Sequence, residues 1–208
     1  SDADSLAGDT SHEANVRKAV RLLAKVPLII AAGHRLAQGQ EPVEPRDDLS
    51  LAANLLYMIS GEEPKAYAIE AMNVSLILYS EHGYNASAFA ARVAASTLAD
   101  MHAAITAGVA TLGGPLHGGA NEAAMEMMLE IGTPDNARTW ILDALQSKRK
   151  IMGFGHREYK SGDSRVPAMK QAGLSVSQET GEDRWRQIAE ISEETMLAEK
   201  GIFPNLDL

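Results

Sequence analysis

The chain contains no cysteine among its 208 residues. This absence excludes disulfide bonds, thiolate catalysis and metal centres with cysteine ligands. It also fits a reducing compartment, so we expect a cytoplasmic protein. Aromatic residues make up only 5% of the chain. No apolar run reaches the ~20 residues that a membrane span requires. The run Leu28–Ala32 is too short, and we expect no membrane partner.

Negative charge exceeds positive charge, and the formal net charge is -9. Such a chain is unsuited to general nucleic-acid binding, so we expect no nucleic-acid partner. Residues 148–170 are an exception, because they carry two acids and these seven cations: Lys148, Arg149, Lys150, Arg157, Lys160, Arg165 and Lys170. A charge run is usually a solvated face. Here it flanks a histidine between glycines, which favours a site for an anionic ligand.

Apolar residues recur at helical spacing along most of the chain, and the predicted fold class is all-α. Ser11 is expected to cap a helix that runs to about Gly33. A short helix is expected to follow Asp48 or Ser50 and to end at Gly61.

The next helix is expected to carry Pro64 in its first turn and Gly83 at its end. Residues 85–114 hold eleven alanines and are predicted to form one continuous helix. Three polar residues fall on one line of this helix: Arg92, Ser96 and Asp100. We interpret them as a polar seam on a buried helix. Further helices are expected over residues 121–132, 136–150 and 182–201, and no segment shows a convincing strand pattern.

Three of the six histidines lie where the helical pattern is interrupted: His82, His117 and His156. Glycines on both sides of a histidine allow a ligand to approach the backbone, and a following helix N-terminus favours negative charge. The spacing of these histidines matches no compact zinc motif. A proton-transfer site is therefore favoured over a metal site, although metal ligation remains an alternative.

Four segments, in this order, resemble the active-site segments of citrate synthases and 2-methylcitrate synthases: EHGYNAS, GPLHGGANEA, GFGHREYKSGDSR and FPNLD. The resemblance extends from about Asp48 to the last residue. It implies a citrate synthase-like helical fold, with part of the large domain over residues 1–116 and the small domain over residues 117–208. It further implies a homodimer that condenses an acyl-CoA with oxaloacetate and water. The coenzyme A thioester would be a substrate, and no metal or other cofactor would be needed.

The resemblance also implies roles for individual residues. His117 would hydrogen-bond the thioester carbonyl, Asp207 would remove the α-proton, and His156 would protonate the oxaloacetate carbonyl. Two further residues would hold oxaloacetate, and a glycine-rich turn would form part of the CoA-binding loop. These residues are His82 and Arg165 for oxaloacetate, and Met152, Gly153, Phe154 and Gly155 for CoA.

Some residues depart from the usual family pattern. Ser164 stands where proline is common, and the resulting GDSRVP segment resembles methylcitrate-type enzymes, which favours propionyl-CoA. Glu158 replaces an apolar residue and partly cancels the local positive charge. The chain looks truncated at both ends compared with the family. Because chain ends fray unless packed, we expect Asp207 to be weakly held and this chain alone to have little activity.

Three alternatives remain open. The first is citrate synthase proper, acting on acetyl-CoA, since a pocket discriminates one methylene by only about 1–3 kcal/mol. The second is a non-catalytic helical dimerisation fragment of the same fold. The third is a helical metallohydrolase that uses the three histidines in helix breaks together with Asp207.

Overall fold

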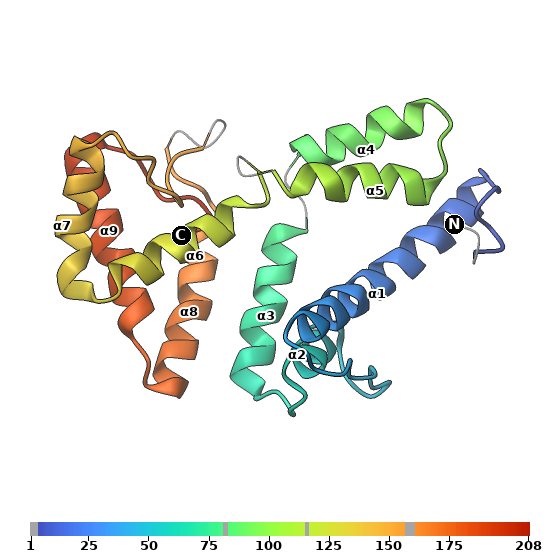
Figure 1. Cartoon of the computed structure of the whole chain (residues 1–208), viewed down its shortest axis with the longest axis horizontal. Helices are drawn as coiled ribbons and strands as arrows, with labels where there is room; N and C mark the ends of the chain where they lie inside the picture. Colours follow the sequence, from blue (N-terminus) through green and yellow to red (C-terminus); the bar gives the residue numbers. More distant parts are fainter. Residues whose placement is uncertain (1–3, 81–82, 115–116, 157–160) are drawn as a thin grey trace. The chain divides into compact units, whose positions relative to one another are not determined.

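The regular elements of the protein are α-helices (Figure 1). The structure is a computed structural model and describes residues 4–80, 83–114, 117–156 and 161–208. Within these residues no strand forms, and the only β-type pairing is an isolated bridge between Phe154 and Pro204. The predicted all-α class is confirmed. Among the described residues, no helix has the length and apolar character needed to cross a membrane.

The chain divides into two compact units, Ser1–Gly113 and Gly114–Leu208. The first unit contains α1 (His12–Ala37), α2 (Leu51–Ser60), α3 (Ala66–Tyr79), α4 (Ala86–Ser96) and α5 (Met101–Leu112). The second contains α6 (Ala120–Ile131), α7 (Pro134–Gln146), α8 (Val166–Thr180) and α9 (Arg184–Lys200). The assignment of these units to part of a large domain and to a small domain stays a prediction.

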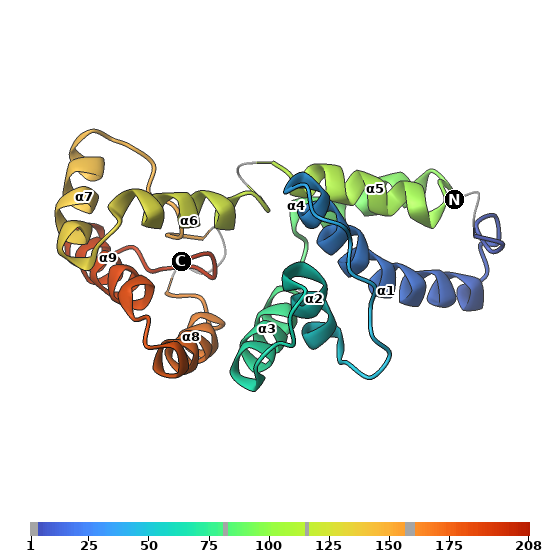
Figure 2. The same cartoon turned by 60° about the horizontal axis from the view of Figure 1, so that its bottom comes forward.

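In the first unit, α2 packs between α1 and α3, and Figure 2 shows α2 and α3 side by side. Their small core contains Ala31, Leu55 and Met58. Ser11 and Ser50 accept hydrogen bonds from the first turns of α1 and α2, as their cap positions predict. The prediction for α3 is wrong at both ends: Pro64 precedes the N-cap residue, and the helix ends at Tyr79.

The predicted single helix over residues 85–114 is wrong, because the chain turns back between α4 and α5. Leu98 has a φ of 64°, which a continuous helix does not allow. Asp100 is the N-cap of α5 and accepts a hydrogen bond from the Ala103 amide at 3.0 Å. Asp100 therefore belongs to a helix start, and the predicted polar seam does not exist. The two helices pack closely at Gly108, where an added Cβ would lie 3.3 Å from the Ser87 carbonyl oxygen.

In the second unit, α7 packs along α9, and α6 contacts both (Figures 1 and 2). The core lies between these three helices and the start of the following loop, and it consists of these buried residues: Met127, Met128, Ile131, Ala137, Ile141, Ala144, Ile151, Ile188 and Met196. This core is larger than that of the first unit, so the second unit offers a firmer frame for a functional site.

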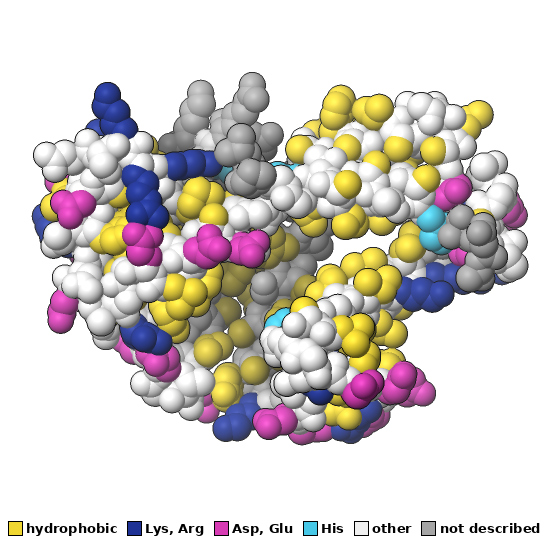
Figure 3. All heavy atoms as spheres, in the orientation of Figure 1, with side chains coloured by type: hydrophobic (Ala, Val, Ile, Leu, Met, Phe, Trp, Pro, Cys, Tyr) yellow, Lys and Arg dark blue, Asp and Glu magenta, His cyan; other side chains and the backbone are white. Residues whose placement is uncertain are grey.

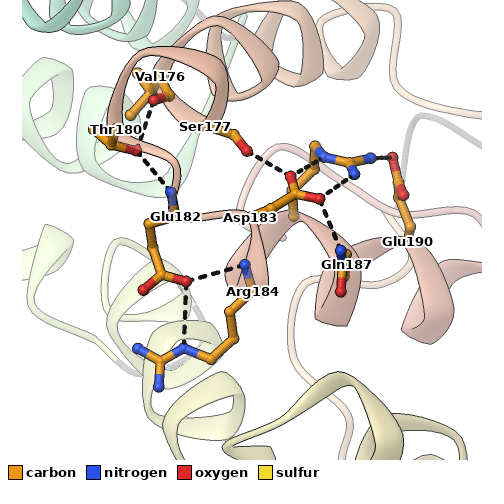
Figure 4. A network of polar contacts seen from close by, with 9 residues as sticks. Val176, Ser177, Thr180, Glu182, Asp183, Arg184, Gln187 and Glu190 are labelled. Carbon is orange, nitrogen blue, oxygen red and sulfur yellow. Dashed lines mark hydrogen bonds and ion pairs between the residues drawn. The ribbon is translucent and has the colours of Figure 1, made fainter.

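Helix α8 was not predicted from the sequence. Hydrogen bonds to the Asp183 side chain link α8 to α9. The Asp183 carboxylate accepts hydrogen bonds from Ser177 of α8, and from Arg186 and Gln187 of α9 (Figure 4). The bonds from Arg186, then those from Ser177 and Gln187, lower the Asp183 pKa below its ordinary value. This network fixes the C-terminal end of α8, whose N-terminal end carries Arg165.

The contact at Gly108 predicts opposite effects for one substitution at two helical glycines. Gly33 lies in α1 with nothing within 4 Å of an added Cβ, so Gly33→Leu should raise the free energy of unfolding by about 0.5–1 kcal/mol. Gly108→Leu must separate α4 from α5 and should lower the free energy of unfolding by about 1–3 kcal/mol. Urea unfolding followed by circular dichroism measures both. Equal effects at the two positions would show that the α4–α5 contact is not tight.

Candidate functional site

Two segments 50 residues apart pair in the second unit. The Gly155 amide donates to the Phe203 carbonyl at 2.9 Å, and the Asn205 amide donates to the Gly153 carbonyl at 2.9 Å. These bonds flank the antiparallel bridge between Phe154 and Pro204. The pairing brings the predicted CoA-binding loop, Met152–Gly155, against the segment that leads to Asp207.

Glycine is required in this loop for two reasons. Gly153 and Gly155 have φ values of 78° and 74°, which side-chain-bearing residues rarely adopt. A Cβ on Gly153 would also lie 2.8 Å from the Leu208 Cβ. The glycines of the GFGH motif thus permit close approach of the final residues to the loop.

The segment around Asp207 is anchored by apolar contacts. Leu206 is buried, and Leu208 packs against the core of the second unit together with Phe154. The Asp207 amide donates to the Asn205 side-chain oxygen at 2.9 Å. The expectation that Asp207 is weakly held is therefore wrong, because its neighbours on both sides are packed and its backbone is hydrogen-bonded.

Asp163 and Arg165 form a local ion pair at the start of α8. One Asp163 oxygen accepts from the Arg165 amide at 3.0 Å and from its Nε at 2.9 Å, and the other accepts from its Nη2 at 2.7 Å. The Asp163 side chain is fully buried and that of Arg165 is 17% exposed. Arg165 is thus held at a helix N-terminus by a carboxylate to which the sequence-based predictions gave no role in the site.

The environment of Asp163 favours its charged form. Burial by itself would raise its pKa, but the hydrogen bonds from Arg165 outweigh burial and hold the pKa below its ordinary value of 3.8. The positive charge of Arg165 and the proximity of His156 act in the same direction. Asp163 therefore connects two predicted site residues electrostatically.

His117 lies in a turn immediately before α6. Its amide donates to the Gly114 carbonyl at 2.9 Å, and its carbonyl accepts from the Ala120 amide at 3.1 Å. The residue as a whole is half-buried. Gly119 is the N-cap of α6 and offers no side-chain hydrogen bond to the first turn, so His117 lies next to backbone donors at a helix N-terminus, as its sequence context predicts.

The predicted cationic cluster is only partly directed at this site. Arg149 makes two hydrogen bonds to Glu130, at 2.7 and 2.6 Å, and its guanidinium lies over the Trp140 ring. Lys170 forms an ion pair with Glu193. These two cations stabilise the surface of the helical frame, so the local positive charge at the site is smaller than the sequence suggests. Arg157 and Lys160 lie outside the described residues.

His82 also lies outside the described residues, so its predicted contact with oxaloacetate has no structural test. His156 is described and half-buried, and it directly follows the paired loop. Across the described ranges, no group of three or more His, Asp or Glu side chains could hold a metal ion. The metallohydrolase alternative thus gains no support, and the expected absence of a metal or cofactor stays a prediction.

Comparison with known proteins covers the whole chain. The family described as "Citrate synthase, C-terminal domain" matches residues 1–208. A Bacillus subtilis protein named Citrate synthase 2 is 48% identical over 204 residues, which cover 98% of this chain and 55% of that protein. A Mycobacterium tuberculosis 2-methylcitrate synthase is 48% identical over 194 residues, which cover 93% and 49% respectively. The chain spans about half the length of these curated relatives.

Solved structures agree with these matches. A citrate synthase from Thermoplasma acidophilum, in a ternary complex with carboxymethyl coenzyme A and oxaloacetate, superposes with a TM-score of 0.88 at 34% identity. The match covers 97% of this chain and 55% of that one. A citryl-CoA lyase from Hydrogenobacter thermophilus superposes with a TM-score of 0.67 at 30% identity, over 77% of this chain and 63% of that one.

The ion pair at Asp163 predicts a pH-dependent contribution to stability. Asp163→Asn should lower the free energy of unfolding at pH 7 by about 3 kcal/mol, because Arg165 loses its buried partner. Since the folded pKa is lowered, this contribution is complete above the ordinary carboxyl pKa of 3.8 and is lost as the pH falls through the folded value. The difference from wild type should therefore narrow in acid.

Urea unfolding between pH 7 and pH 3 measures this difference. Asp143→Asn is the control, because Asp143 is exposed on α7 and its removal should change stability by less than about 0.5 kcal/mol. Similar losses for both variants at pH 7 would show that the Asp163–Arg165 pair does not stabilise the fold.

Proposed function

The chain belongs to the citrate synthase family, and from this premise we propose that it supplies the small domain and part of the large domain of an enzyme that joins an acyl-CoA to oxaloacetate. Water then hydrolyses the new thioester, and the products are a tricarboxylate and free CoA. The observation that carries the proposal is the pairing of the GFGH loop with the segment that holds Asp207. This pairing unites two motifs whose predicted roles are the acid and the base of one reaction.

The proposed chemistry needs a base and a hydrogen-bond donor at the same time. The α-proton of a thioester is weakly acidic, so a carboxylate removes it only if a donor stabilises the enolate that develops. Asp207 is the proposed base, and the His117 imidazole is the proposed donor to the thioester oxygen. The α-carbon then attacks the carbonyl carbon of oxaloacetate while His156 delivers a proton to the carbonyl oxygen.

Arg165 is the proposed ligand of an oxaloacetate carboxylate, because a guanidinium binds a carboxylate through two parallel hydrogen bonds. Its bonds to Asp163 fix the plane of the guanidinium before substrate arrives. His82 is proposed to bind oxaloacetate as well, and Met152–Gly155 to contact CoA. We propose that the thioester is the only coenzyme involved and that the reaction occurs in the cytoplasm.

Propionyl-CoA is the proposed acyl donor, with 2-methylcitrate as product. The support is the GDSRVP segment together with the 48% identity to a 2-methylcitrate synthase. The identity to a protein named Citrate synthase 2 is equally high, so acetyl-CoA is the alternative donor. A non-catalytic fragment is the second alternative, since the chain spans about half the length of its relatives.

The test is release of free CoA from propionyl-CoA and from acetyl-CoA in the presence of oxaloacetate. It uses this chain by itself and this chain extended to the length of its relatives. The extended protein should release CoA with both thioesters, with a higher kcat/KM for propionyl-CoA. His117→Ala should lower its kcat by about 10²–10³-fold, because one donor to the developing oxyanion is lost.

His12→Ala is the control, because His12 is exposed at the start of α1 and its removal should leave kcat unchanged. No CoA release by the extended protein would favour the non-catalytic alternative. A kcat of His117→Ala within threefold of wild type would remove His117 from the mechanism. A higher kcat/KM for acetyl-CoA would reverse the proposed substrate preference.

We also propose that the chain forms a homodimer through the faces of α4 and α5. Four large apolar side chains on these helices are 45–61% exposed: Phe89, Val93, Val109 and Leu112. Figure 3 shows apolar side chains gathered over both helices. A patch of this kind on a soluble protein usually marks an interface, and a second copy is the occupant that the family resemblance implies.

Val109→Glu should weaken this dimer by at least tenfold in Kd, because it buries a charge in an apolar interface. Sedimentation equilibrium across a concentration series measures the effect. Leu142→Glu is the control, since Leu142 is an exposed apolar residue on α7 in the other unit. Equal effects of the two substitutions would place the interface elsewhere.

A further inference from the structure

Asn205 forms hydrogen bonds with all of its polar groups, two of them across the paired segments and two within its own segment. Its side-chain Nδ2 donates to the Gly155 carbonyl at 2.9 Å, and its Oδ1 accepts from the Asp207 amide at 2.9 Å. Its own amide donates to the Gly153 carbonyl, and its carbonyl accepts from the Leu208 amide. The two side-chain bonds require a donor on one side and an acceptor on the other, so they fix the orientation of the amide.

The two side-chain bonds act on the backbone next to the proposed acid and base. The Gly155 carbonyl lies in the peptide bond between Gly155 and His156. The Asp207 amide lies in the peptide bond between Leu206 and Asp207. One short, stiff side chain therefore links both peptide units.

If the chain continued as an extended strand after Asn205, Asp207 would lie far from His156. In antiparallel pairing, the partner of Phe154 is Pro204, so residues after 204 run back past residues 153 and 152, away from His156. Two extended residues would carry Asp207 about 7 Å in that direction. The bonds that Asn205 accepts from the amides of Asp207 and Leu208 form a turn that reverses this course.

The position of Leu208 shows that the chain does reverse. Asn205 is hydrogen-bonded to Gly153, so an extended residue 208 would lie opposite residue 150. Instead, the Leu208 Cβ lies 2.8 Å from the position of a Cβ on Gly153. The turn after Asn205 therefore returns the chain to Gly153, the residue to which Asn205 is itself hydrogen-bonded.

We propose that Asn205 is a positioning residue that sets the spacing between His156 and Asp207. This inference rests on the proposed function, in which these two residues are the acid and the base. Asn205 touches no reacting atom. It acts by holding the turn of residues 205–208 to the Gly155 carbonyl. Removal of the Asn205 side chain should therefore slow the chemical step more than it weakens substrate binding.

Two variants separate the two side-chain bonds. Asn205→Ala removes both, and should lower kcat by about 10²-fold because a displacement on the order of 1 Å at the reacting groups costs that much. The KM of each substrate should change by less than threefold. Asn205→Asp keeps the acceptor for the Asp207 amide but turns a carboxylate oxygen toward the Gly155 carbonyl, and should also lower kcat at neutral pH.

The pH profile of Asn205→Asp gives a readout that a merely structural role would not move. When the introduced carboxyl is protonated, it can donate to the Gly155 carbonyl again. The kcat of this variant, divided by that of wild type at the same pH, should therefore rise as the pH falls. Asn136→Ala is the matched control, because Asn136 Nδ2 donates to the Ile131 carbonyl at 3.1 Å in the same unit and its kcat should stay within threefold of wild type.

Hydrogen exchange at the Asp207 amide tests the two side-chain bonds of Asn205, called the Asn205 clamp below, without an activity assay. NMR on this 208-residue chain should show about tenfold faster exchange of that amide in Asn205→Ala, since its acceptor is lost, and an unchanged rate in Asn136→Ala. An unchanged rate in Asn205→Ala would overturn the clamp, as would a kcat within threefold of wild type in the extended protein. If wild type releases no CoA but the exchange result holds, the proposed function fails and the clamp stands as a structural link.

Discussion

The candidate site depends on the short antiparallel contact between residues 153–155 and residues 203–205. Its two backbone hydrogen bonds contribute about 1 kcal/mol each, which is too little to close a loop of 50 residues. Full burial of a large apolar side chain contributes about 1.5–3 kcal/mol; Leu206 is buried, and Phe154 and Leu208 are partly buried against the core. The apolar anchors therefore hold the segments together, while the hydrogen bonds set their register.

The two units differ in how completely they cover their apolar side chains. Among the described residues, the core of the second unit has nine buried members and that of the first has three. Helix α3 is apolar but has no buried residue, whereas a helix that is apolar on all sides is usually enclosed. The second unit thus encloses its own core, against which the segments of the candidate site pack. The first unit presents apolar surface that is suited to contacts with further polypeptide.

Local signals in the sequence predicted much of this fold. Ser11, Ser50 and Gly201 mark helix ends as expected, because caps act within one turn. The break at Leu98 escaped prediction, since alanines on both sides satisfy a helix and Asp100 fits a polar seam on a continuous helix as well as it fits an N-cap. The motifs around His117, His156 and Asp207 were visible, but their contacts were not. Partners 50 residues apart, such as Asn205 and Gly155, leave no periodic trace in the chain.

In the proposed function an acidic chain must bind an anion, and Asp163 prepares Arg165 for that contact. The chain carries a net charge of -9, and two cations of the 148–170 segment are paired with surface acids, so the positive field available to the proposed substrate is weaker than the sequence suggests. Asp163 cancels much of the charge of Arg165 as well. What it adds is order: two of the guanidinium nitrogens are bound to a buried carboxylate, so less side-chain entropy is lost when a substrate binds. In the proposed function, recognition of oxaloacetate therefore depends more on the fixed direction of a few donors than on the amount of positive charge.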